Sequence, residues 1–249
     1  MAKSLSSSRA SSGMGSPSDL VEYTYKTLDS ITGGFRPRNH MGSTQGGDLF
    51  RGKILQDMET REVVVKIWET PSDLRKYLRF SGPSPDLRQS RLKAEIKILT
   101  DSVLCGHPNM VKLNGYCFEN GYYFGVVYDL EPLDTVHKLV LQDDFRWLAQ
   151  IKVALEFACL VECLHGEELL LRNTDVAHLI VDQAFSPRLV DFSQLVGGIF
   201  GGIPSGEREL GCPGYVDRTS YRIRYLDRQD GCFCIWYRTS GANRQKKSV

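Results

Sequence analysis

The sequence predicts an α+β protein in two lobes, in which strand-forming segments come first and helical segments follow. The segment "EVVVKIW" at 62–68 is dense in β-branched residues, which favour strands. The segment 146–165 instead repeats apolar residues at helical spacing. With 249 residues, 41% of them hydrophobic, the chain is long enough to bury real cores.

The two ends of the chain differ in composition from its middle. Residues 1–18 are rich in serine and glycine, so we expect a disordered tail there. We expect the strand-rich lobe over 19–131 and the helical lobe over 132–217. Residues 218–249 hold eight basic and two acidic residues, which is more typical of a solvated basic tail than of a nucleic-acid site. The net charge of the whole chain is only +1, so no nucleic acid is expected as a partner.

The elements of the first half can be predicted in order. Residues 19–31 place apolar side chains at mixed helical spacings, which predicts a short helix ended by the glycine pair that follows. Strands are predicted over 48–55 and 62–68, and Lys66 lies inside the second strand. A lysine in such a strand must have its ammonium group paired or directed into a cleft.

A helix over 87–103 is predicted next, with Leu92, Ile96 and Leu99 on one face. Glu95 lies beside that face rather than opposite it. We therefore expect an ion pair between this glutamate and the lysine of the preceding strand.

Two more strands are predicted over 110–119 and 122–130, followed by a short helix after Asp134 and a long helix over 146–165. Four residues of the long helix are predicted to form a buried stripe: Ile151, Leu155, Ala158 and Cys159.

The cysteines and the lengths of the apolar runs indicate the cellular location of the protein. The chain has seven scattered cysteines and no secretory signal, which favours reduced thiols in the cytoplasm. Cys232 and Cys234 have no second pair at zinc-binding spacing. No apolar run approaches the ~20 residues that a transmembrane helix needs. We expect a cytoplasmic protein, with a peripheral position at the plasma membrane as the alternative.

Several short motifs follow one another in a fixed order. "MGSTQGGDLFRG" places Gly42 and Gly47 where a phosphate-binding glycine loop has its first and third glycines. Lys66, Glu95 and the segment Asp191-Phe192-Ser193 follow. This order resembles the motif set of the protein kinase family.

Two further segments make the resemblance more specific, one near the start of the chain and one at the expected connection between the two lobes. "YTYKTLDSITGGF" at 23–35 and the pair Tyr128-Asp129 resemble plant receptor-like cytoplasmic kinases. The resemblance covers about residues 22–217 and implies a protein-kinase-like two-lobe fold with a truncated or divergent C-lobe. In such a C-lobe, the long helix would lack part of its packing partner and expose an apolar face.

The resemblance also implies a nucleotide site, with Mg²⁺ held by Asp191. Its residues would be Gly42, Gly47, Leu49, Val64, Lys66 and Glu95. Whether ATP binds stays open, and we expect any binding to be weak, because Val64 is larger than the alanine that kinases usually place there. The alternative for Lys66 and Glu95 is a purely structural ion pair.

The catalytic loop departs from the family pattern within "LRNTDVAHLIVD" at 171–182. Spacing matches Asn173 to the catalytic base, Asp175 to the usual lysine and His178 to the metal-binding asparagine. An amide cannot accept a proton near neutral pH, and an imidazole is a poor ligand for Mg²⁺. We therefore predict that none of the three is catalytically competent; Asp175 as a displaced base is the alternative.

Taken with the resemblance, these substitutions imply a pseudokinase similar to the resistance-related inactive kinases of plants. Such a protein would act as an adaptor, scaffold or decoy in defence signalling by docking to a partner kinase or an immune receptor. Two alternatives stay open: a weakly active ATP-dependent Ser/Thr protein kinase, and an incomplete fragment with no function of its own.

Overall fold

The structure is a computed structural model, and it describes residues 20–44, 47–56, 58–68, 85–121, 123–171, 176–192 and 195–197. The predicted tails at 1–18 and 218–249, and the predictions for Asn173 and Asp175, lie outside these residues. Among the helices of the described segments, none combines the length and the apolar character that crossing a bilayer requires.

The first lobe is built on a six-stranded sheet with the order β1-β5-β6-β4-β3-β2. All pairs are antiparallel except β1–β5, which is parallel. The strands are β1 (Val21–Glu22), β2 (His40–Ser43), β3 (Asp48–Gln56), β4 (Glu59–Ile67), β5 (Lys112–Glu119) and β6 (Tyr123–Asp129). The predicted strands around 48–55, 62–68, 110–119 and 122–130 are therefore confirmed, with small shifts at their ends.

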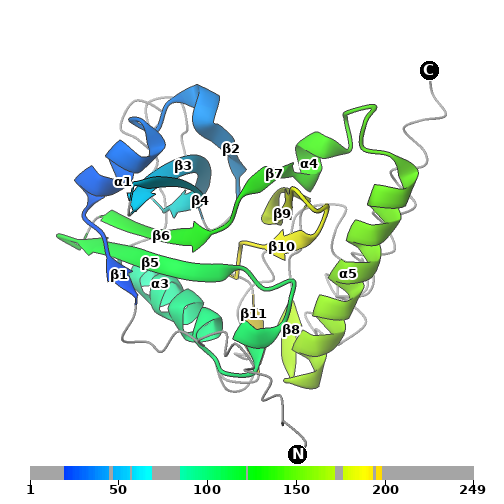
Figure 1. The fold of residues 1–249 in the computed structure, drawn as a ribbon. Helices are drawn as coiled ribbons and strands as arrows, with labels where there is room; N and C mark the ends of the chain where they lie inside the picture. The colour runs from blue at the N-terminus through cyan, green and yellow to red at the C-terminus, as the bar shows by residue number, and fades with distance from the viewer. Residues whose placement is uncertain are drawn as a thin grey trace, which may run out of the picture.

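Helices cover both faces of this sheet (Figure 1). Helix α1 (Tyr25–Thr32) packs on one face against β3 and β6, in a core cluster that includes Val63 and Val65 of β4, and helix α3 (Pro85–Leu99) lies on the other. Successive side chains of a strand point to opposite faces. Val64 and Lys66 therefore point toward α3, which is the face that continues into the second lobe.

The start of the chain differs from the prediction of a helix over 19–31. Residues 21–22 form the edge strand β1, and the helix begins only after Thr24, whose hydroxyl accepts a hydrogen bond from the Thr27 amide at 3.1 Å. Gly115 permits the strand pairing, because a Cβ there would lie 2.1 Å from the Val21 carbonyl oxygen. As predicted, glycine ends the helix: Gly33 has φ +67° at its C-terminal cap.

The described part of the second lobe combines short strands with two helices. Its elements are β7 (Pro132–Thr135), α4 (Val136–Leu139), α5 (Trp147–Gly166), β8 (Leu169–Leu171), β9 (Leu179–Asp182), β10 (Pro187–Leu189) and β11 (Leu195–Gly197). They form the small sheets β10-β9-β7 and β11-β8. The predicted long helix over 146–165 is confirmed as α5, and α4 is the short helix expected after Asp134. The helix predicted over 87–103 is shorter than expected, since α3 ends at Leu99.

The prediction of a buried stripe on α5 was wrong. Ile151, Leu155 and Cys159 are exposed, and Ala158 is half-buried. The buried residues of the helix are instead Val153, Phe157, Leu160, Val161 and Leu164. Both faces of α5 carry apolar residues, and packing against β8 and β10 decides which face is buried. We also expected this helix to expose an apolar face, and the face that carries Leu155 is exposed.

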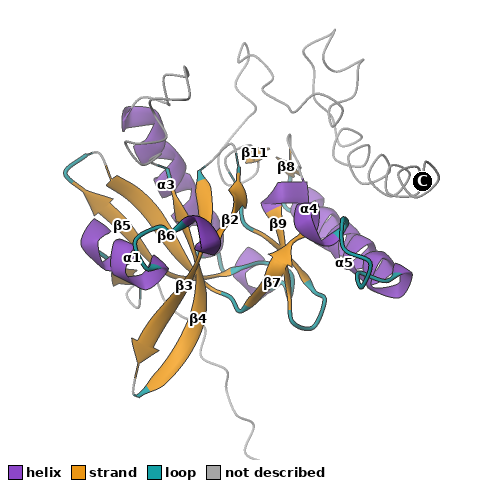
Figure 2. Ribbon diagram, turned by 90° about the horizontal axis from the view of Figure 1, so that it is seen from above, coloured by secondary structure: helices purple, strands orange, loops and turns teal. Residues whose placement is uncertain are grey.

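One hydrophobic core runs through both lobes. It includes Val64 and Tyr128 of the sheet together with Leu171 and Phe192 of the second lobe. Seen from above, β2 lies beside β7 and α4, so the lobes meet at this edge as well as at the chain connection after β6 (Figure 2).

Candidate functional site

The candidate site lies between the two lobes and is assembled from four parts of the chain. Lys66 comes from β4, Glu95 from α3 and Tyr128 from β6, while Val190 and Asp191 follow β10. None of these five side chains is more than 2% exposed. Sequence reasoning predicted that Lys66, Glu95 and Asp191 meet here, and the structure brings them together.

Lys66 is surrounded by partners from within the chain. Its Nζ donates to Glu95 Oε2 at 2.5 Å and to the Val190 carbonyl oxygen at 3.0 Å, and it lies 3.8 Å from Asp191 Oδ1. The ring of Trp68 adds a cation–π contact, with Nζ 4.7 Å from the ring centroid. The ion pair predicted between Lys66 and Glu95 is therefore confirmed.

Tyr128 is a member of the cluster that sequence reasoning did not identify as a site residue. Its hydroxyl is hydrogen-bonded to Glu95 Oε1 and lies 2.9 Å from the Val190 carbonyl oxygen. Burial, followed by the charge of Glu95, raises the pKa of Tyr128 well above its ordinary value, so the phenol keeps its proton. Burial also raises the pKa of Glu95, while the charge of Lys66 lowers it. The sequence offered one signal for this role, because the tyrosine lies one residue before the end of the buried strand β6.

Asp191 lies between two nitrogen-bearing side chains. Its Oδ1 faces Lys66, and its Oδ2 is 3.6 Å from Nε2 of His178, which is also buried. The short 3₁₀ turn Val176–His178 presents this histidine, and its carbonyl oxygen accepts a hydrogen bond from the Val190 amide at 3.0 Å. The two positions that the resemblance assigns to metal binding are therefore brought together.

This arrangement does not fit a magnesium ion on Asp191. Mg²⁺ requires near-octahedral oxygen ligands at about 2.0–2.1 Å and usually keeps several waters. Here one carboxylate oxygen faces an ammonium group and the other an imidazole, and the carboxyl group is almost fully buried. Across the described residues, no group of three His, Cys, Asp or Glu side chains could hold a metal.

The residues expected around a nucleotide lie in or beside strands β2, β3 and β4. Gly42 lies in β2, and Gly47 packs so closely on β4 that a Cβ would lie 2.1 Å from the Ile67 carbonyl oxygen. The side chains of Leu49 and Val64, expected to contact an adenine, are 0% exposed. Both side chains are therefore inaccessible to a ligand in this arrangement of the two lobes.

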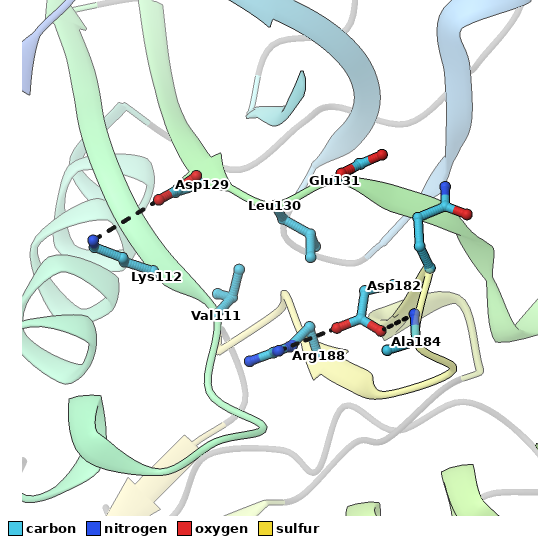
Figure 3. A pocket seen from close by; sticks show the side chains of 9 residues that line it. Val111, Lys112, Asp129, Leu130, Glu131, Asp182, Ala184 and Arg188 are labelled. Atoms are coloured by element: carbon cyan, nitrogen blue, oxygen red, sulfur yellow. Dashed lines mark hydrogen bonds and ion pairs between the residues drawn. The ribbon is translucent and has the colours of Figure 1, made fainter. Parts of the chain in front are cut away.

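A separate hollow of about 330 Å³ lies where the connection after β6 meets the β9–β10 turn (Figure 3). Val111 and Leu130 form its buried floor. Its rim is charged, and the charges are largely paired: Arg188 lies 3.1 Å from Asp182, which also caps the turn by accepting from the amides of residues 184 and 186. None of its lining residues belongs to the Lys66 cluster, so we interpret this hollow as structural.

The strand order, the flanking helices and the Lys66–Glu95–Asp191 arrangement define a protein-kinase-like, two-lobed α+β fold. Comparison with known proteins supports this class. The chain is 26% identical over 233 residues to wall-associated receptor kinase-like 14 of Arabidopsis thaliana, which covers 91% of this chain and 30% of that protein.

Two further relatives are the probable serine/threonine-protein kinases PBL21 and PBL22 of the same plant, each 26% identical. The matches cover 68% and 78% of this chain, and 42% and 48% of those proteins. The chain thus spans between about a quarter and a half of the length of the curated relatives it matches. No family model matches the chain.

Proposed function

We propose that this chain is a catalytically impaired protein-kinase-like protein that acts as an adaptor, scaffold or decoy in plant signalling. The proposed signalling role is in plant defence. The observation that carries the proposal is the contact of His178 Nε2 with Asp191 Oδ2 at 3.6 Å. It supports a site in which an imidazole has taken the place of a magnesium ligand. The proposed partner is a kinase or an immune receptor, and the proposed location is the cytoplasm or the inner face of the plasma membrane.

The chemistry of phosphoryl transfer explains why this contact matters. The reaction depends on a lysine that reaches the phosphates, on metal ions that neutralise charge, and on a base that accepts the substrate proton. Asp191, which would hold the metal, instead faces two nitrogen-bearing groups, Lys66 and His178. An amide at Asn173 in place of the base would remove a further contribution of roughly 10²–10⁴-fold.

A weakly active Ser/Thr protein kinase is the second candidate, and one observation favours it. The Lys66–Glu95 pair is formed at 2.5 Å, which is the pairing that active protein kinases require. In that case Asp175 would serve as a displaced base. The two candidates differ in whether the pair supports transfer or only stabilises the fold.

A phosphotransfer assay separates the two candidates. The full chain is incubated with radiolabelled ATP and a general protein substrate, once with Mg²⁺ and once with Mn²⁺. The proposal predicts the same background incorporation for the wild type, Lys66→Ala and Asp191→Ala. Incorporation by the wild type that both variants abolish would establish the kinase.

Docking needs its own experiment, because absence of transfer does not demonstrate an adaptor. Affinity capture from plant tissue should recover the same kinase or receptor with the wild type and with Lys66→Ala, and adding ATP should not change the yield. Reproducible failure to recover any kinase or receptor would contradict the adaptor role. This outcome would leave the incomplete fragment as the remaining interpretation.

A further inference from the structure

Side-chain contacts join strands β2 and β3 of the sheet to the second lobe at the edge where the two lobes meet. Arg51 of β3 reaches across to β7, where its Nη1 donates to the Pro132 carbonyl oxygen at 2.6 Å and its Nη2 to that of Leu133. The same guanidinium group lies 3.6 Å from Asp134 Oδ2. A planar guanidinium can donate to several acceptors at once with little loss of side-chain freedom per bond.

A second tie runs in the opposite direction, from the second lobe to the edge strand of the first. Nζ of Lys138 in α4 donates to the His40 carbonyl oxygen of β2 at 3.1 Å and lies 3.8 Å from Asp134 Oδ1. Asp134 thus lies between the two cations, one from each lobe. Its position is fixed further by the Thr135 amide, which donates to Oδ1 at 2.8 Å.

Between these ties, strand β2 also lies close to β7. A Cβ added to Gly42 of β2 would lie only 3.9 Å from Cγ2 of Thr135, a side chain that is itself buried. The two lobes therefore lie close together at Gly42 and Thr135 as well as at the two ties.

We propose that Arg51, Asp134 and Lys138 form a latch that holds the two lobes closed without any nucleotide. In this protein, contacts between β2–β3 and β7–α4 replace the ligand that would otherwise draw the lobes together. The latch does not depend on the proposed function, because a chain without transfer activity could still have an open cleft.

Hydrogen–deuterium exchange on the full chain measures the latch directly, since amides exchange when a segment opens locally. The variants are Arg51→Ala and Lys138→Ala. The matched control is Lys53→Ala, which removes an exposed cation of the same strand that pairs with Glu62 at 3.3 Å within the sheet. The amides to follow are those of β2, β7 and, as an internal reference, α5.

Arg51→Ala should speed exchange in β2 and β7 by about tenfold, because it removes two charge-assisted hydrogen bonds from the closed state. Lys138→Ala should act on the same two segments, and α5 should keep its rates in both variants. Lys53→Ala should match the wild type everywhere.

Three results would overturn the latch. Exchange in β2 and β7 that is equal in Arg51→Ala, Lys138→Ala and Lys53→Ala would show that the ties do not hold the lobes. Acceleration spread evenly over α5 as well would show a general loss of stability instead. Wild-type β2 and β7 that become protected only when Mg·ATP is added would show that closure needs the nucleotide.

Discussion

Tyr128 has one hydroxyl proton and lies close to two acceptors, Glu95 Oε1 and the Val190 carbonyl oxygen. Only one of them can receive that proton. The hydroxyl donates to Glu95 Oε1, so the carboxylate of the Lys66–Glu95 ion pair accepts from two donors. Keeping the charge of Glu95 in this cluster costs free energy, because the carboxylate of Asp191 lies beside the same cation, Lys66. Burial, which raises the pKa of Glu95, works in the same direction.

The stability of the protein should therefore respond to pH through Glu95. Because the pKa of Glu95 is higher in the folded chain than in the unfolded chain, the folded state holds more protons between these two values. The stability linked to this proton is present in acid and is lost as the pH rises through the folded-state pKa. We predict that the unfolding free energy of the wild type falls relative to that of Glu95→Gln across this window.

The measurement is urea unfolding of both proteins at a series of pH values. Glutamine mimics the protonated carboxyl group, so its own curve should lack this decline. A wild type that instead gains stability over Glu95→Gln as the pH rises would show that Lys66 outweighs burial and lowers the pKa.

How far the sequence could predict the site is clear from individual residues. Lys66 and Glu95 were predictable because each is a charged residue on or beside the apolar face of its own element. Tyr128 was not, because a buried tyrosine in a strand looks like any core aromatic until its partners are known. The assignments of Asn173 and Asp175 stay predictions, since both lie outside the described residues.

Among the elements, α1 gives the sheet a second covered face. Leu28 is fully buried against the sheet, in a core cluster separate from the one between the lobes. We predict that Leu28→Ala lowers the unfolding free energy by about 2–5 kcal/mol, because it leaves a cavity under the helix. Lys26→Ala, on the exposed side of the same helix, should change it by less than about 0.5 kcal/mol.

Chemical denaturation of the two variants of α1 beside the wild type tests this role. Equal stabilities would mean that α1 is not part of the cooperative unit. The sequence could not give the start of this helix, because Leu20 and Tyr23 continue its apolar pattern into a segment that pairs with β5.

Helix α5 shows why periodicity alone failed to identify a buried face. Apolar residues occur on both sides, and Leu155 on one side is 63% exposed while Phe157 on the other is buried. We predict that Leu155→Glu changes the unfolding free energy by less than about 0.5 kcal/mol and reduces binding of a hydrophobic dye. Phe157→Ala should cost about 3–5 kcal/mol.

Unfolding curves and dye fluorescence of the two α5 variants provide the check. If Leu155→Glu destabilised the protein as strongly as Phe157→Ala, the face carrying Leu155 would have to be covered in the folded chain. In that case, α5 would bury more of its surface in the folded chain than the structure shows.

At the scale of the whole molecule, the two-lobed arrangement was predictable and the closure of its cleft was not. The order of strands and helices along the chain, together with the spaced motifs, indicated the fold. Closure depends on Arg51, Asp134 and Lys138, which are ordinary charged residues with no pattern in sequence. Their effect comes from carbonyl oxygens and a carboxylate that meet only in the folded chain.

The central proposal is that this chain keeps a kinase-like fold whose two lobes are held closed by its own side chains. The most direct measurement is the thermal unfolding of the wild type during a titration with ATP and Mg²⁺. A nucleotide that binds the folded state at 100 times its Kd would add about 2.7 kcal/mol of stability. We predict no saturable rise in the unfolding temperature up to millimolar ATP. A saturable rise that Lys66→Ala removes would contradict the claim.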